Sequence, residues 1–103
     1  MSKSINNGAP VGMFICNDPI DCSWREYINR LVKNTLPQVK IMNQVRDEPF
    51  SKAWFLRTHD RILRSEVVTV LIGEGSWISK TVAWELECAL ALKKSLVILN
   101  LNS

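Results

Sequence analysis

The carboxyl-terminal part of the chain contains one carboxylate whose setting suits catalysis, Glu85. The neighbouring indole of Trp84 would partly shield Glu85 from water and raise its pKa. That would prepare it for proton transfer or for stabilising a developing cation. If Glu85 lies near a helix start, the helix dipole acts the other way and favours the ionised form. A solvated helix glutamate is the competing interpretation, and both stay open at this point.

The loop that precedes this helix could contact a ligand. Gly73 and Gly75 allow close backbone approach, and the amides that begin the helix could receive a phosphate, although Glu74 would repel one. The loop is neither a Walker loop nor a GxGxxG fingerprint. Trp77 in this loop and Trp84 after it could stack on an adenine or nicotinamide ring, or could cap the core instead.

A second polar loop follows the first apolar run of the chain. Asn17, Asp18 and Asp21 could bind ribose hydroxyls there, or could form an Asx turn and a helix cap. The single histidine, His59, has no serine or cysteine partner in a recognisable motif, which argues against triad chemistry. The spacing of cysteines is not that of metal ligands, so we predict no metal site.

Hydrophobic periodicity predicts that strands and helices alternate along the chain. We expect strands at 11–16, 39–42, 67–72 and 96–101. We expect helices from Ser23 to about Asn34, from Ser51 towards Arg64, and from about Ser79 to Lys94. This order predicts an α/β, flavodoxin-like three-layer sandwich, with a parallel sheet of about four strands and helices on both faces. Residues 1–10 should form a flexible amino terminus and 11–103 a single domain.

Several packing details follow from the same patterns. Ser23 and Glu26 have the spacing of a capping box, and Lys93 and Lys94 should occupy the last turn of the third helix. The first helix should bury Trp24, Tyr27, Ile28, Leu31 and Val32, and Trp54 should also belong to the core. The third helix should pack through Val82, Leu86, Ala89 and Leu90.

Composition excludes several classes of protein. The net charge of +3 is mild and the basic residues are dispersed, which does not indicate a nucleic-acid surface. No apolar stretch approaches the roughly 20 residues that span a bilayer, and the amino terminus lacks the apolar core of a secretory signal. We therefore expect a cytoplasmic protein with reduced thiols and no membrane contact.

The segment from Ile62 to Leu101 resembles the TIR-like domains of the ThsB-like group from Thoeris antiphage systems. The similarity rests on the strand Val70-Leu71-Ile72-Gly73 and on the block Ser79-Lys80-x-Val82-x-Trp84-Glu85-Leu86, followed by Lys94 and Val97-Ile98. Upstream, Met13-Phe14-Ile15 is similar to the first strand of the family. Thr81 departs from the usual tryptophan, Ser76-Trp77 replaces threonine and an aromatic, and the chain stops after its fourth strand.

The resemblance implies a TIR fold that cleaves the nicotinamide–ribose bond of NAD, with Glu85 as the catalytic residue. NAD is then a substrate, no cofactor is bound, and the nucleotide product switches on an effector protein in antiviral defence. Self-association would complete the site. For substrate binding we predict Phe14, Asn17, Asp18, Asn43, Gly73, Trp77 and Trp84. The alternative is a catalytically inactive TIR-like module that binds partners or a nucleotide through self-assembly.

Overall fold

Strands and helices alternate through the whole computed structural model, which describes residues 10–18, 22–73 and 79–101. The predicted α/β order is confirmed, and the bounds of β1 and β3 are those expected from their apolar runs. The elements are β1 (Val11–Cys16), α1 (Cys22–Thr35), β2 (Val39–Ile41), α2 (Lys52–Leu63), β3 (Val67–Ile72), α3 (Lys80–Ala91) and β4 (Ser95–Asn100).

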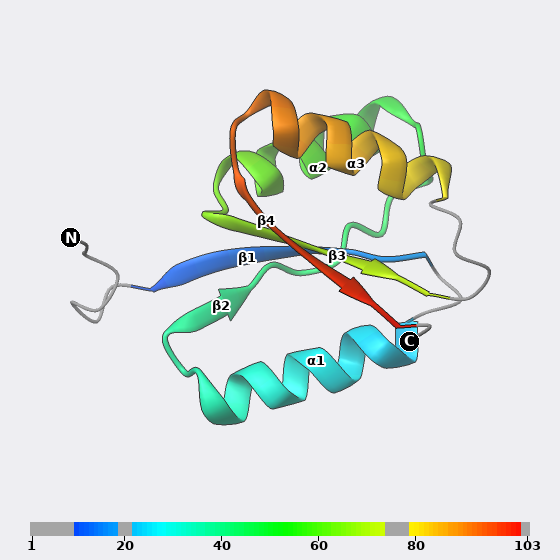
Figure 1. Cartoon of the computed structure of the whole chain (residues 1–103). Coiled ribbons are helices and arrows are strands. Elements are labelled where there is room, and N and C mark those ends of the chain that lie inside the picture. Colours follow the sequence, from blue (N-terminus) through cyan, green and yellow to red (C-terminus); the bar gives the residue numbers. More distant parts are fainter. Residues whose placement is uncertain (1–9, 19–21, 74–78, 102–103) are drawn as a thin grey trace.

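The four strands form one parallel sheet in the order β2-β1-β3-β4. Helix α1 covers one face, while α2 and α3 cover the other (Figure 1). The chain forms β2 on one side of β1 and then crosses back to form β3 on the other side, so the strand order reverses between β1 and β3. Ligands of open α/β sheets bind outside the carboxyl ends of the strands at such a switch point.

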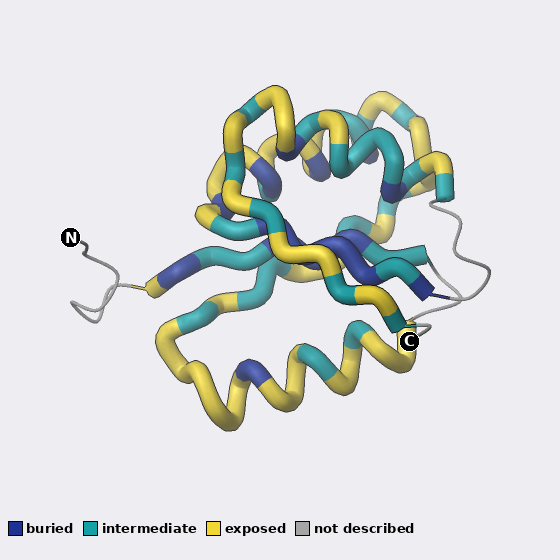
Figure 2. Tube along the Cα trace, viewed as in Figure 1, coloured by how far each residue is buried: buried dark blue, intermediate teal, exposed yellow. Residues whose placement is uncertain are grey.

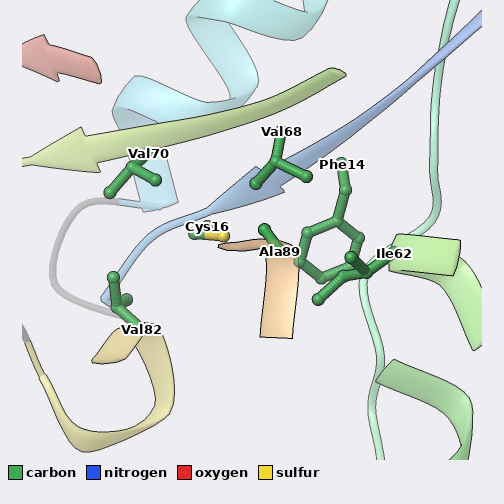
Figure 3. Close-up of a cluster of buried hydrophobic side chains, with 7 residues drawn as sticks. All are labelled: Phe14, Cys16, Ile62, Val68, Val70, Val82 and Ala89. Carbon is green, nitrogen blue, oxygen red and sulfur yellow. The ribbon is translucent and has the colours of Figure 1, made fainter. Parts of the chain in front are cut away.

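The main hydrophobic core lies between the sheet and the α2–α3 layer (Figure 3). Side chains from β1 and β3 meet side chains from both helices, and the cluster consists of Phe14, Cys16, Ile62, Val68, Val70, Val82 and Ala89. Val68 and Val70 are fully buried on this face of β3, and Thr69 and Leu71 are buried on the opposite face, as expected for a central strand covered on both faces. This layer fixes the position of α3, and hence of Glu85.

The other face of the sheet is covered less completely, and the predicted buried face of α1 is largely wrong (Figure 2). Trp24, Tyr27 and Leu31 are 44%, 48% and 46% exposed, whereas Val32 is buried and Ile28 is partly buried. The physical reason is that α1 packs chiefly on β2, a strand of three residues. So narrow a surface covers only one line of side chains, and Trp24 does not belong to the core.

Two details at helix ends also differ from expectation. Helix α1 begins at Cys22, so Ser23 lies inside it and is not its N-cap. Helix α3 ends at Ala91, so Lys93 and Lys94 lie beyond its last turn, with Lys93 at a positive φ of 59°. Lys94 instead donates a hydrogen bond from Nζ to the Leu63 carbonyl at 2.8 Å. Leu90 is 56% exposed and is not part of the packing stripe.

Candidate active site

Glu85 lines a cavity of about 110 Å³ at the carboxyl edge of the sheet. The cavity lies beside the switch point, between the end of β1, α1, the loop after β2, and the helices α2 and α3. Its lining consists of Phe14, Ile15, Asn17, Arg25, Gln44, Val45, Asp47, Pro49, Trp54, Thr81 and Glu85. Of the two interpretations open from the sequence, the one that places this carboxylate in a hollow agrees with the fold.

The start of α3 determines where Glu85 points. Ser79 is the N-cap, and its Oγ accepts a hydrogen bond from the Val82 amide at 3.3 Å. Val82 is buried against the sheet and sets the rotation of the helix about its axis. Thr81 and Glu85 are four residues apart and therefore share a helix face, and both line the cavity.

Burial dominates the electrostatics of Glu85 and raises the pKa of its carboxyl group from 4.5 to about 7. A hydrogen bond with the Cys16 thiol and the positive charge of Arg25 both lower that pKa, without cancelling the effect of burial. Neither of the described ion pairs, Arg57–Asp47 and Arg64–Asp60, includes Glu85. The carboxylate is therefore poised to titrate near neutral pH.

Arg25 holds together the backbone around the cavity. Its Nη1 donates to the Ile15 carbonyl at 2.9 Å and to Asn17 Oδ1 at 3.1 Å, and its Nη2 donates to the Met42 carbonyl at 3.1 Å. These bonds connect α1 to the ends of β1 and β2. Burial lowers the pKa of Arg25, while the negative charge of Glu85 acts to raise it. Arg25 thus both shapes the site and stabilises the ionised form of Glu85.

Comparison with known proteins gives a family. Residues 14–103 match the family model described as "Thoeris protein ThsB, TIR-like domain". The chain belongs to this family. The match confirms the resemblance inferred from the sequence, and it covers the second half of β1, which supplies Phe14, as well as α3, which supplies Glu85. No curated protein matches the chain.

Solved structures support the fold of this TIR-like domain. One similar structure is a 2-desoxiribosyltransferase from Leishmania mexicana, at a TM-score of 0.69 and 16% identity. The alignment covers 88% of this chain but only 65% of that one. Another is a 2-deoxyribosyltransferase from Bacillus psychrosaccharolyticus, at a TM-score of 0.68 and 14% identity, covering 90% and 75% of the two chains. At these identities the likeness shows the fold alone.

The structure of the TIR-like domain brings some of the predicted substrate-binding residues together and separates others. Phe14 and Asn17 line the Glu85 cavity, and Asn17 Nδ2 donates to the Asp18 carbonyl at 2.9 Å. Gly73 is buried at the end of β3. Asn43 lines a neighbouring hollow, not this cavity. Trp77, Asp21 and the loop residues 74–78 lie outside the described residues.

Trp84 and Trp54 are neighbours in the structure, but only Trp54 lines the cavity. Trp84 packs against Trp54 and Phe55, with ring centroids 5.3 Å and 5.1 Å apart, and it is not among the residues that line the cavity. Trp54 is 4% exposed, as predicted for a core residue, and it also lines the cavity, as does Phe14.

Sequence reasoning also missed the role of Arg25, although one signal was present. Arg25 lies three and seven residues before Ile28 and Val32, the two residues of α1 that turn towards the sheet. A charged residue on the inward face of a helix requires partners, and these are the two backbone carbonyls and the Asn17 amide oxygen.

Among described residues, no group of three or more His, Cys, Asp or Glu could hold a metal ion. Within that same part, no helix is both long and apolar enough to span a bilayer.

Proposed function

We propose that this TIR-like domain cleaves the bond between nicotinamide and ribose in NAD, with Glu85 as the catalytic carboxylate. The observation that carries the proposal is the position of Glu85, partly buried in a cavity at the carboxyl edge of the sheet. The family membership supports it independently of that geometry.

The chemistry needs a negative charge more than it needs an acid. The nicotinamide ring of NAD is already cationic, so when the C–N bond breaks its electron pair moves to the ring nitrogen and nicotinamide leaves neutral. Positive charge then develops on the ribosyl group, as in other glycosidic cleavages. The ionised Glu85 carboxylate stabilises that charge, and it does so strongly because the cavity limits access of water. Attack by water or by another hydroxyl on the ribosyl carbon completes the reaction.

The size of the cavity supports a proposal for the part of the substrate that it receives. Pockets for drug-sized ligands measure about 300–1,000 Å³, whereas this cavity measures about 110 Å³. It therefore accommodates the nicotinamide end of NAD, with the indole of Trp54 as its apolar wall and the Asn17 amide as a partner for ribose hydroxyls. The two similar structures are named as deoxyribosyltransferases, which is consistent with glycosyl-transfer chemistry on this fold.

The nucleotide product would carry a signal to an effector protein in antiviral defence, acting in the cytoplasm. The direct test is to incubate purified protein with NAD and to quantify free nicotinamide by liquid chromatography. We expect Glu85→Gln to reduce release by about 10²–10³-fold. Glu87→Gln, which removes an exposed carboxylate from the same helix, is the matched control. Equal release by wild type and Glu85→Gln would remove Glu85 from this role.

A second candidate function is an inactive interaction module that self-associates. The exposed apolar residues Trp24, Tyr27 and Leu31 on α1 favour it, because such a group commonly marks a contact surface. Mass photometry of wild type and Tyr27→Glu separates the candidates. Assembly that Tyr27→Glu abolishes, without nicotinamide release in any assembly state, supports the module over the enzyme.

A further inference from the structure

A second hollow adjoins the Glu85 cavity and is rich in arginine. It measures about 490 Å³ and is lined by Asn43, Gln44, Arg46, Asp47, Arg57 and Arg61. Gln44 and Asp47 line both hollows, so the two lie side by side along the loop after β2. Arg57 and Arg61 are four residues apart on α2 and therefore project from the same face of that helix.

The charges of this hollow favour an anion. Arg57 Nη1 contacts Asp47 Oδ2 at 2.6 Å, so this carboxylate is already neutralised within the hollow. The remaining two arginines, Arg46 and Arg61, have no carboxylate partner among the described ion pairs. Arg61 makes one long contact, from Nη1 to the Arg57 carbonyl at 3.5 Å, which leaves most of its donors available. The hollow thus presents two uncompensated positive charges.

We propose that this hollow binds the pyrophosphate of the dinucleotide whose nicotinamide ribose occupies the Glu85 cavity. The inference rests on the proposed function and adds a subsite to it. A pyrophosphate diester carries two negative charges at neutral pH, which matches the two uncompensated arginines. Guanidinium groups bind phosphate oxygens through paired, charge-assisted hydrogen bonds. The amides of Asn43 and Gln44 add neutral donors at the rim.

The geometry also explains why the loop after β2 is anchored at two points. Arg25 holds the Met42 carbonyl at its start, and the Arg57–Asp47 pair holds its middle against α2. This loop forms the boundary between the two hollows. A fixed boundary keeps a constant separation between the anion site and the carboxylate, as a ligand that spans both would require.

Calorimetric titration of NAD into the Glu85→Gln protein tests the proposal, because that variant should bind NAD without cleaving it. Adding Arg46→Gln or Arg61→Gln should weaken NAD binding about tenfold each and reduce its dependence on salt. Binding of nicotinamide riboside, which lacks the pyrophosphate, should not change. Arg30→Gln, on an exposed position of α1, is the control with the same loss of charge. Arg57 is left intact because its removal would leave Asp47 without its ion-pair partner.

Each outcome separates this inference from the proposed function. If wild type releases nicotinamide but the Arg46 and Arg61 variants bind NAD as the Arg30 variant does, the anion site is wrong and the enzyme stands. If wild type releases none while NAD binding still depends on Arg46 and Arg61, the anion site stands and the enzyme is wrong. Equal weakening of NAD and nicotinamide riboside, or no NAD binding by Glu85→Gln protein, overturns the pyrophosphate site.

Discussion

Replacing Glu85 by glutamine should stabilise the folded protein relative to wild type, and this gain should be larger at alkaline pH than at acidic pH. The folded protein raises the pKa of Glu85 from 4.5 to about 7, chiefly through burial. Between these values the folded state holds a proton that the unfolded state has lost, so wild-type stability falls as the pH rises. Above pH 7 the penalty is complete, and below pH 4.5 it is absent.

The size of this effect follows from the same pKa change. Each pKa unit corresponds to about 1.4 kcal/mol, so a rise from 4.5 to about 7 gives about 3 kcal/mol. Glutamine has nearly the same shape and does not titrate. The difference in unfolding free energy between Glu85→Gln and wild type should therefore shift by about 3 kcal/mol in favour of the variant between pH 4 and pH 8.

Urea unfolding at several pH values measures this quantity, and thermal unfolding should show a change of about 15 °C in the difference between melting temperatures. Glu87→Gln is the matched control, because Glu87 is exposed on the same helix. Its curve should follow that of wild type at every pH. If Glu85→Gln also follows the wild-type pH profile, the fold does not raise the pKa of Glu85. The electrostatic argument for the site then fails.

Three further predictions follow from the same structure. Arg25→Gln should destabilise the protein by about 2 kcal/mol, through loss of three charge-assisted hydrogen bonds, against less than about 0.5 kcal/mol for Arg30→Gln; equal melting temperatures for the two would contradict this. Trp54→Ala should lower the unfolding free energy by about 3–5 kcal/mol. Trp24 is 44% exposed, so Trp24→Ala should lower it by roughly 1 kcal/mol or less. Similar losses for the two variants in urea titration would contradict the burial of Trp54. Nicotinamide release should increase with pH through about 7 as Glu85 ionises, with a higher midpoint in Arg25→Gln; a rate that falls over this range would assign Glu85 the role of an acid.

The sequence predicts this fold well because each central element has a clear apolar period. The runs of β1 and β3 are almost entirely apolar, as expected for strands that are covered on both faces. Ser51 and Ser79 cap α2 and α3 through their hydroxyls, as expected for serine ahead of a helix. The position of Glu85 at the carboxyl edge follows from the alternation of elements, because parallel strands end at the same side of the sheet.

The remaining features depend on tertiary contacts that no local pattern encodes. The apolar face of α1 is regular, but its burial depends on how much sheet lies beneath it, and β2 supplies only three residues. Arg25 looked like an ordinary helix arginine because its acceptors are the carbonyls of Ile15 and Met42, 10 and 17 residues away. The aromatic wall of the cavity could not be assigned either, since Trp54 and Trp84 become distinguishable only once α2 and α3 pack together.

A role for Glu85 in stability alone is difficult to reconcile with its surroundings. A carboxylate that serves the fold normally gains partners that lower its pKa, whereas burial raises the pKa of Glu85 to about 7 in spite of the Cys16 thiol and the charge of Arg25. An amide of the same shape would remove the penalty at neutral pH. Groups held in such an unfavourable state concentrate at functional sites, where the same burial that opposes ionisation strengthens the attraction of the ionised group for a developing cation. The destabilisation by Glu85 and its proposed catalysis are therefore two consequences of one environment, and a variant that relieves the first should abolish the second.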